Sequence, residues 1–212
     1  NEVISSETVS FYRRNLEADM QNYNANEVLI ANSFVEHIKN IDSMYFYIDC
    51  LYPISNIGER RVAANLLEER DLEQMQRFFL VFWNKRNKLE PERDWELYLT
   101  MVKYAHKQFG TGTVPGYRTD MGRVLLQYGK PSLIETNNQD PSNYPYQIWQ
   151  YDVLISESTP VQNNQIFVFV DQAGVGRNYR LIHSAAIGEV HDSKWEYALS
   201  KVLNRGGDVD AT

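Results

Sequence analysis

The alternation of hydrophobic and polar residues predicts helices through the first half of the chain. The clearest helix is expected over residues 91–109, because Pro91 suits the first helical position and Gly110 follows the last. A second is expected after Asp71, whose side chain can cap it. On the apolar side of the helix at 91–109 we expect Trp95, Leu99, Val102, Ala105 or His106, and Phe109. On that of the helix after Asp71 we expect Leu72, Met75, Phe79, and Phe82 or Trp83.

Other segments of this half are less regular. Residues 1–40 have the pattern of a loosely amphipathic helix with an Asn-rich interruption. The apolar run at 44–55 is typical of a buried helix or a short strand, and residues 59–70 favour a helix.

Beyond Gly110 the pattern changes to the alternation of extended chain. Strands are expected at 123–128, 147–154, 165–171 and 179–184, and a short closing helix at 195–203. The third strand is apolar on both faces, which indicates a central position in the sheet. The glycine-containing loop at 172–178 predicts a hairpin between the third and fourth strands.

These elements predict an α+β fold. An N-terminal helical part, residues 1–110, is expected to pack on a C-terminal, mainly antiparallel sheet within residues 111–212. No repeat or low-complexity linker separates them, so one compact unit is expected.

Composition narrows the class of protein. Hydrophobic residues make up 43% of the chain and charged residues 23%, which is typical of a globular protein. The net charge of -7 and the scattered Lys and Arg argue against a nucleic-acid partner. No apolar run is long enough to span a membrane, and the single cysteine, Cys50, is expected to be buried. Because the chain begins at Asn1, we expect a processed piece of a longer exported protein, from which a signal or lipid anchor has been removed.

No motif for a cofactor, a metal or a nucleophile is apparent. The glycines at 110–116 follow a helix and precede an expected strand, the reverse of a phosphate loop. The four histidines lack zinc-site spacing, and His183 with Ser184 lacks a nucleophile elbow. The sequence therefore predicts no metal site, no cofactor and no catalytic residue.

Aromatic residues around the second strand are candidates for contact with a ligand or partner. Trp149 and Tyr151 fall on the same face of the strand. Such a row stacks on sugar rings, contacts a partner protein, or fills the core. Two acids near strand ends could act as paired carboxylates in a glycan site. The candidate set is Tyr144, Tyr146, Trp149, Tyr151, Asp152 and Asp171.

The stretch PGYRTDMGR, residues 115–123, predicts two successive turns. Pro115 and Gly116 suit a type II turn, with a positive φ at the glycine. We expect Asp120 to accept backbone N–H bonds from Met121 or Gly122, with Thr119 in a similar role, and Arg123 to pair with Asp120. Tyr117 is expected to anchor the loop in the core. The motif is therefore predicted to be structural support rather than catalytic machinery.

The same residues carry a family resemblance, over roughly residues 45–195. The chain resembles the GWxTD domain of Bacteroidota and related bacteria, with Tyr117 in place of the tryptophan. The matching motif residues are Pro115, Gly116, Tyr117, Thr119, Asp120, Gly122, Arg123, Tyr128, Gly129 and Pro131. The resemblance implies an extracytoplasmic cell-envelope protein, often with a lipid anchor, and no established enzymatic activity. Because the sequence also lacks a catalytic constellation, we expect a non-catalytic interaction or scaffold domain with an envelope protein partner; the alternative is a glycan-binding or glycan-processing domain.

Overall fold

The fold is α+β, as the sequence predicts. A computed structural model describes residues 29–156, 159–174, 176 and 178–201. The described elements run in the order η2 (Phe34–His37), α2 (Ile41–Asp49), η3 (Tyr52–Ile54), α3 (Ile57–Glu69), α4 (Leu72–Arg86), α5 (Pro91–Phe109), η4 (Gly116–Arg118), α6 (Asp120–Tyr128), β1 (Leu133–Asn137), β2 (Tyr146–Ser156), β3 (Thr159–Val170), β4 (Arg180–Ser184) and α7 (Trp195–Leu199). Most of the amphipathic helix expected over residues 1–40 lies outside the described residues.

The helical half is built around an aromatic core. Asp71 caps α4 by accepting the Gln74 N–H, and Pro91 occupies the start of α5, as predicted. Side chains of α2, α4 and α5 pack edge to face, for example Phe79 on Trp95 with 4.8 Å between ring centroids. The apolar run at 44–55 forms the helix α2 and the turn η3 rather than a strand, and Cys50 is buried.

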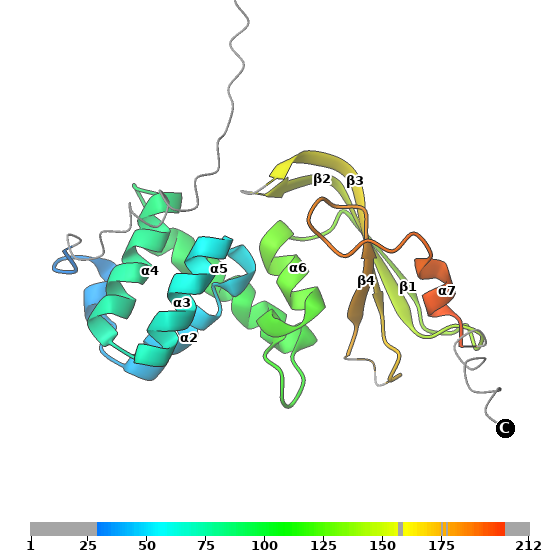
Figure 1. Ribbon diagram of the computed structural model, residues 1–212, viewed down its shortest axis with the longest axis horizontal. Helices are drawn as coiled ribbons and strands as arrows, with labels where there is room; N and C mark the ends of the chain where they lie inside the picture. Colours follow the sequence, from blue (N-terminus) through cyan, green and yellow to red (C-terminus); the bar gives the residue numbers. More distant parts are fainter. Residues whose placement is uncertain (1–28, 157–158, 175, 177, 202–212) are drawn as a thin grey trace, which may run out of the picture.

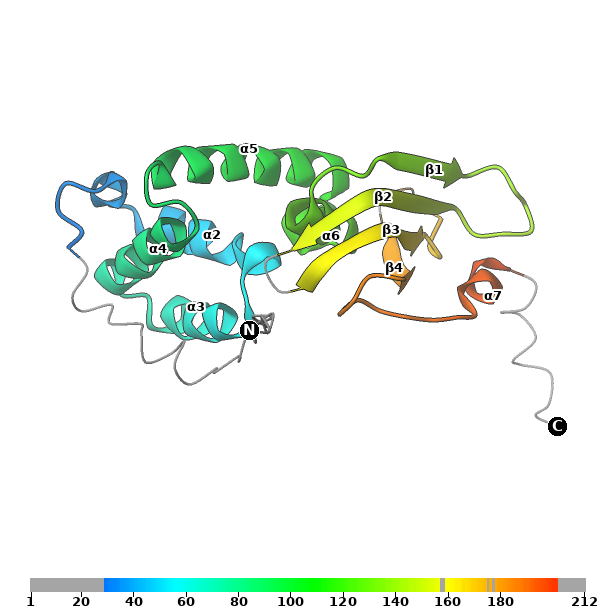
Figure 2. The ribbon, with the colours of Figure 1, turned by 90° about the horizontal axis from the view of Figure 1, so that it is seen from above.

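Helix α6 lies between the helical half and the sheet (Figure 1). Seen from above, the long α5 runs along one side of the molecule, and its end lies beside α6 near the start of the sheet (Figure 2). Helix α6 contacts α5 on one side and β2 and β4 on the other. It therefore joins the two halves.

The sheet is antiparallel, with strand order β1-β2-β3-β4. β3 is central and buried on both faces at its end, and β3 and β4 form the expected hairpin. One face packs on α5 and α6 and the other on α7, so the sheet is covered by helices on both sides (Figure 1). The closing helix at 195–199 confirms the short helix predicted there.

The prediction of a strand at residues 123–128 is wrong, because this segment is helix α6. Thr119 caps the helix, and Met121, Val124, Leu125 and Tyr128 recur at spacings of three and four that suit a helix. A short apolar run fits either structure, and the N-cap decides it here. The first strand is instead β1, Leu133–Asn137, whose mostly exposed residues carry no clear alternation.

Candidate functional site

A cleft of about 720 Å³ lies where the helical half, helix α6 and the sheet meet. One wall comes from η3 and the start of α3, and the other from the end of β2, the start of β3 and the loop at 187–190. Helix α6 contributes the floor. The lining residues are Tyr52, Pro53, Ile54, Ser55, Asn56, Ile57, Arg60, Arg123, Gln127, Tyr128, Ile155, Ser156, Thr159, Ile187, Gly188, Glu189 and Val190.

The β2–β3 hairpin reaches this position because it is longer than its neighbours. β1 pairs with β2 only as far as Gln150, and β4 pairs with β3 only from Phe167. The rest of the two strands extends as a ribbon that curves over α6 (Figure 1). The loop at 187–190 is held beside this ribbon by the backbone N–H of Ile187, which donates to Gln162 Oε1 at 2.8 Å.

Exposed apolar side chains gather around the cleft. Ile57 is 58% exposed, Ile155 68% and Ile187 57%, and Tyr52 and Val190 are also exposed. These residues come from separate segments of the chain, and folding brings them together around one opening. Large apolar side chains exposed together are typical of a binding surface.

A hydrogen-bonded network forms the floor. Arg123 donates to both carboxylate oxygens of Glu189, at 2.8 and 2.7 Å, and Tyr128 donates to Glu189 Oε1 at 2.8 Å. The side chain of Glu189 is only 6% exposed. Burial alone would lower the pKa of Arg123, but the hydrogen bonds and charge of Glu189 outweigh it and raise that pKa. Arg123 therefore stays charged, and its two hydrogen bonds to Glu189 tie the loop at 187–190 to α6.

The network corrects the predicted pairing of Arg123 with Asp120. Asp120 instead accepts the backbone N–H of Leu181 at 2.8 Å, which fastens α6 to β4. Thr119 provides the cap, since its Oγ1 accepts the Gly122 N–H at 3.1 Å. Asp120 thus bridges two elements rather than closing a local turn, because the segment after it is helical.

Gly116 also differs from the type II turn that the sequence predicts. Pro115 precedes the short helix η4, which begins at Gly116, and the φ of Gly116 is not positive. A Cβ on Gly116 would lie 2.1 Å from the carbonyl oxygen of Ala105, so the residue is needed for close packing against α5. Tyr117 is the buried anchor that was predicted, and its hydroxyl donates to Asp49 at 2.7 Å.

The end of the motif is also structural. Helix α6 ends at Tyr128, with Gly129 as its C-cap at φ 80°. The carbonyl of Gly129 accepts the Tyr151 hydroxyl at 2.9 Å. Pro131 lies in the link from α6 to β1.

Removing the Asp120 carboxylate tests its bridging role. We expect Asp120→Ala to lower the free energy of unfolding by about 1–2 kcal/mol, because the Leu181 N–H loses its acceptor. Asp120→Asn keeps an acceptor oxygen and should retain most of the stability. Urea unfolding of the three proteins measures both effects, and equal midpoints for the wild type and Asp120→Ala would contradict the role.

The predicted aromatic row is divided between the core and the other face of the sheet. Trp149 and Tyr151 are each 2% exposed and pack against Phe109 and Tyr128. Tyr144 and Tyr146 are half-buried near α7 on the opposite face. These four residues therefore form no flat exposed platform.

The two candidate acids are also apart. Asp152 is exposed near the hairpin tip, whereas Asp171 is fully buried and accepts the N–H groups of Gly174 and Gly176. Asp171 follows Val170, which pairs with Tyr146, so the acids are separated by about 20 Å along β2. They cannot act as paired carboxylates.

His183 is used to hold the segment after β4. Its Nδ1 accepts the Asp192 N–H at 3.1 Å, and its ring stacks on Trp195. Burial, and then the neighbouring His191, lower the pKa of His183 below its usual 6.5. The folded protein therefore favours the neutral ring.

This pKa shift predicts a pH-dependent stability. The unfolded chain binds the proton more readily than the folded one, so stability should fall as the pH drops below about 6.5. His183→Gln removes this titration, and its loss of stability between pH 7 and pH 5 should be smaller than that of the wild type. Thermal unfolding across this range measures the difference, and parallel curves would contradict it.

The sequence did not identify the cleft. Its apolar residues are isolated in the sequence, and Glu189 lies in a loop without a motif. Of the residues that line the cleft, only Arg123 and Tyr128 belong to the motif that the sequence analysis identifies. The sequence predicts a structural role for them, and both also have that role.

Comparisons with other proteins find no match: no protein-family model, curated protein or solved structure matches the chain. Within the described residues, no group of three or more His, Cys, Asp or Glu side chains is placed to hold a metal ion. The described helices include none that is long and apolar enough to cross a membrane.

Proposed function

We propose that the chain is a non-catalytic interaction domain of a bacterial cell-envelope protein, and that it holds a protein partner in the cleft between its two halves. The observation that carries the proposal is the cluster of exposed apolar side chains around the cleft, at Tyr52, Ile57, Ile155, Ile187 and Val190. Covering these side chains on binding removes apolar surface from water, which is the main driving force of protein association.

The polar side chains of the motif are all engaged in holding the fold together. This supports a binding role for the cleft rather than a catalytic one. Tyr117 binds Asp49, Asp120 binds the Leu181 N–H, and Arg123 binds Glu189. Each of these side chains is engaged in joining elements of the fold. The motif therefore shapes the floor of the cleft and leaves recognition to the walls.

The envelope location is proposed from the resemblance to the GWxTD domain. It is tested separately, by fractionating cells that produce the full-length protein and by adding protease to intact cells and to spheroplasts. We expect the protein in the envelope fraction, outside the cytoplasm. Recovery in the cytoplasm would contradict this part of the proposal.

The glycan alternative has little support. It rested on an exposed aromatic row and on paired acids, but Trp149 and Tyr151 are buried and Asp152 lies far from Asp171. We therefore retain the interaction domain as the proposed function.

A charge placed in the cleft should block partner binding. We expect Ile187→Lys to reduce the cross-linked partner in native membranes by at least about tenfold, because the lysine must be desolvated in an apolar interface. Leu97→Lys is the matched control, since Leu97 is equally exposed on α5 and lies outside the cleft. Both variants should unfold at the wild-type temperature.

Quantitative cross-linking followed by mass spectrometry measures this effect. A stoichiometric partner that is lost only in Ile187→Lys supports the proposal. Repeated failure to capture a stoichiometric partner with the wild type would contradict it.

A further inference from the structure

We propose that Arg60 binds an acidic side chain of the partner, and that the cleft recognises an apolar peptide segment that carries this acid. The inference rests on the proposed function and adds the chemistry of the partner. It follows from the charges in the cleft, from the way Arg60 is held, and from its apolar neighbours.

Arg60 is held in place, but no carboxylate in the described part of the chain neutralises it. It is half-buried in the wall of the cleft, its Nε donates to the Tyr52 carbonyl at 3.1 Å, and its guanidinium lies 4.2 Å from the centre of the Tyr52 ring. None of the ion pairs among the described residues includes Arg60. The remaining guanidinium N–H groups are left to bind another acceptor.

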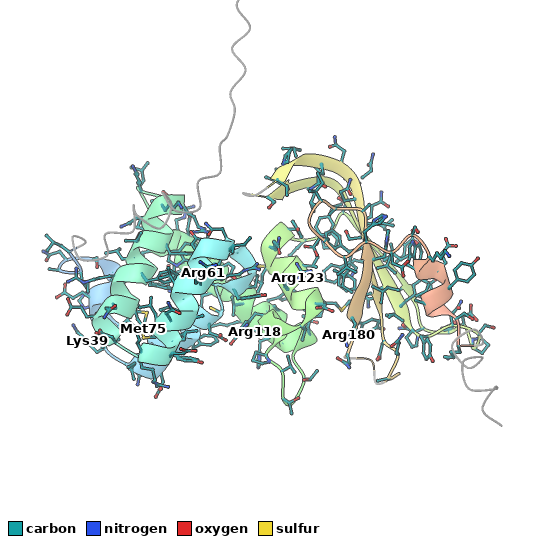
Figure 3. The ribbon with its side chains drawn as sticks, in the orientation of Figure 1. Lys39, Arg61, Met75, Arg118, Arg123 and Arg180 are labelled. Atoms are coloured by element: carbon teal, nitrogen blue, oxygen red, sulfur yellow. The ribbon has the colours of Figure 1, made fainter. Side chains whose placement is uncertain are left out.

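The other arginines near the cleft are already neutralised. Arg118, whose guanidinium also lies over the Tyr52 ring, pairs with Asp49, and Arg123 pairs with Glu189. Arg118 and Arg123 both lie between the helical half and the sheet (Figure 3). The lining residues that the structure describes include two arginines and one glutamate, so together they carry a charge of about +1 on a chain of net charge -7. This local charge complements an anionic group.

The neighbours of Arg60 indicate which kind of anionic partner fits. Ile57 lies three residues before Arg60, on the same side of α3, and Ile155, Ile187 and Val190 line the rest of the cleft. An acid that reaches Arg60 therefore needs apolar groups beside it. A peptide segment with large apolar residues next to Asp or Glu meets both requirements.

The stacked arginine should make the acid important for affinity. Its position over Tyr52 reduces the side-chain freedom lost on binding. A hydrogen bond to a charged group in this setting corresponds to about 10- to 100-fold in affinity.

A random dodecapeptide library with amidated C-termini tests the inference against the full 212-residue chain. The amide removes the terminal carboxylate, so an enriched acid must be a side chain. We expect the enriched peptides to combine large apolar residues with Asp or Glu. Replacing that acid by its amide should weaken binding to the wild type by at least about tenfold, and should have no effect on binding to Arg60→Gln.

Arg61→Gln is the matched control. Arg61 follows Arg60 on α3, is exposed and does not line the cleft (Figure 3). This variant should bind the selected peptides as the wild type does, with the same loss when the acid is replaced. The comparison separates a specific contact at Arg60 from a general effect of positive charge on α3.

Other outcomes would overturn the inference. These are the enrichment of no peptide, an acid whose replacement still weakens binding to Arg60→Gln, and binding of phosphatidylglycerol vesicles that requires Arg60 without any peptide binding. The last result would assign the site to lipid. A partner captured in membranes through Ile187, but bound equally well by Arg60→Gln, would remove this inference and leave the proposed function standing.

Discussion

We expect the Gly122→Ala variant to lose about 3 kcal/mol or more of its free energy of unfolding, because its new methyl group collides with the backbone. A Cβ at Gly122 would lie 1.8 Å from the carbonyl oxygen of Gly116. This clash cannot be relieved by a rotamer change, since the obstructing atom belongs to η4, which is packed against α5. Helix α6 would have to move away from η4, and the contact between the two halves would loosen.

Gly112→Ala is the control for this substitution. A Cβ at Gly112 meets no atom within 4 Å, so the same chemical change should alter stability by only a few tenths of a kcal/mol. Urea unfolding followed by tryptophan fluorescence compares the variants. Equal stability of Gly122→Ala and the wild type would show that α6 does not pack as described.

The second large effect concerns the ion pair on the cleft floor. We expect Glu189→Leu to lower the free energy of unfolding by about 3–5 kcal/mol, because Arg123 is then left largely buried without its partner. Tyr128 also loses its acceptor. The loop at 187–190 should detach from α6, which changes the shape of the cleft as well as the stability.

A double variant separates the loss of the Arg123–Glu189 ion pair from other effects of the substitutions on stability. Arg123→Met with Glu189→Leu removes both charges, so it should be more stable than Glu189→Leu alone, despite carrying one more substitution. Chemical unfolding of the wild type, both single variants and the double variant completes the cycle. If the loss of unfolding free energy in the double variant equals the sum of the losses in the two single variants, the result would contradict a direct ion pair.

The sequence predicted the fold class and most of the helices because their signals are local. Asp71 and Pro91 mark helix starts, and the apolar spacing of α4 and α5 identifies their buried sides. The strands β2, β3 and β4 were recognised from alternation and from the glycine-containing loop. In each case the deciding residues lie within one turn or one strand of the chain.

Two predictions about the motif are wrong for different reasons, one local and one that depends on a distant contact. Residues 123–128 fit a strand by composition, but Thr119 starts a helix there and the sheet packs on its apolar side. Arg123 had a plausible local partner in Asp120, while the actual partner, Glu189, is far along the chain. The N-cap Thr119 and the apolar spacing of α6 are local signals of a helix, but no local pattern distinguishes Glu189 from Asp120 as the partner of Arg123.

The cleft could not be predicted for the same reason. Its walls come from segments far apart in the sequence, residues 52–60, 155–156 and 187–190, and no single segment contains a binding motif. Trp149 and Tyr151, the aromatic residues that the sequence predicts as candidates for partner contact, are buried in the core. Exposure, which decides whether an apolar residue binds a partner, depends on the complete fold.

The most direct test of the interaction-domain proposal is site-specific photo-cross-linking of the full-length protein in its own membranes. A photoreactive amino acid at position 187 is compared with the same amino acid at position 97. We predict that one partner protein is cross-linked from Ile187, in the cleft, and not from Leu97, on the exposed side of α5. Equal cross-linking from both positions, or none from Ile187, would contradict the proposal that the cleft holds the partner.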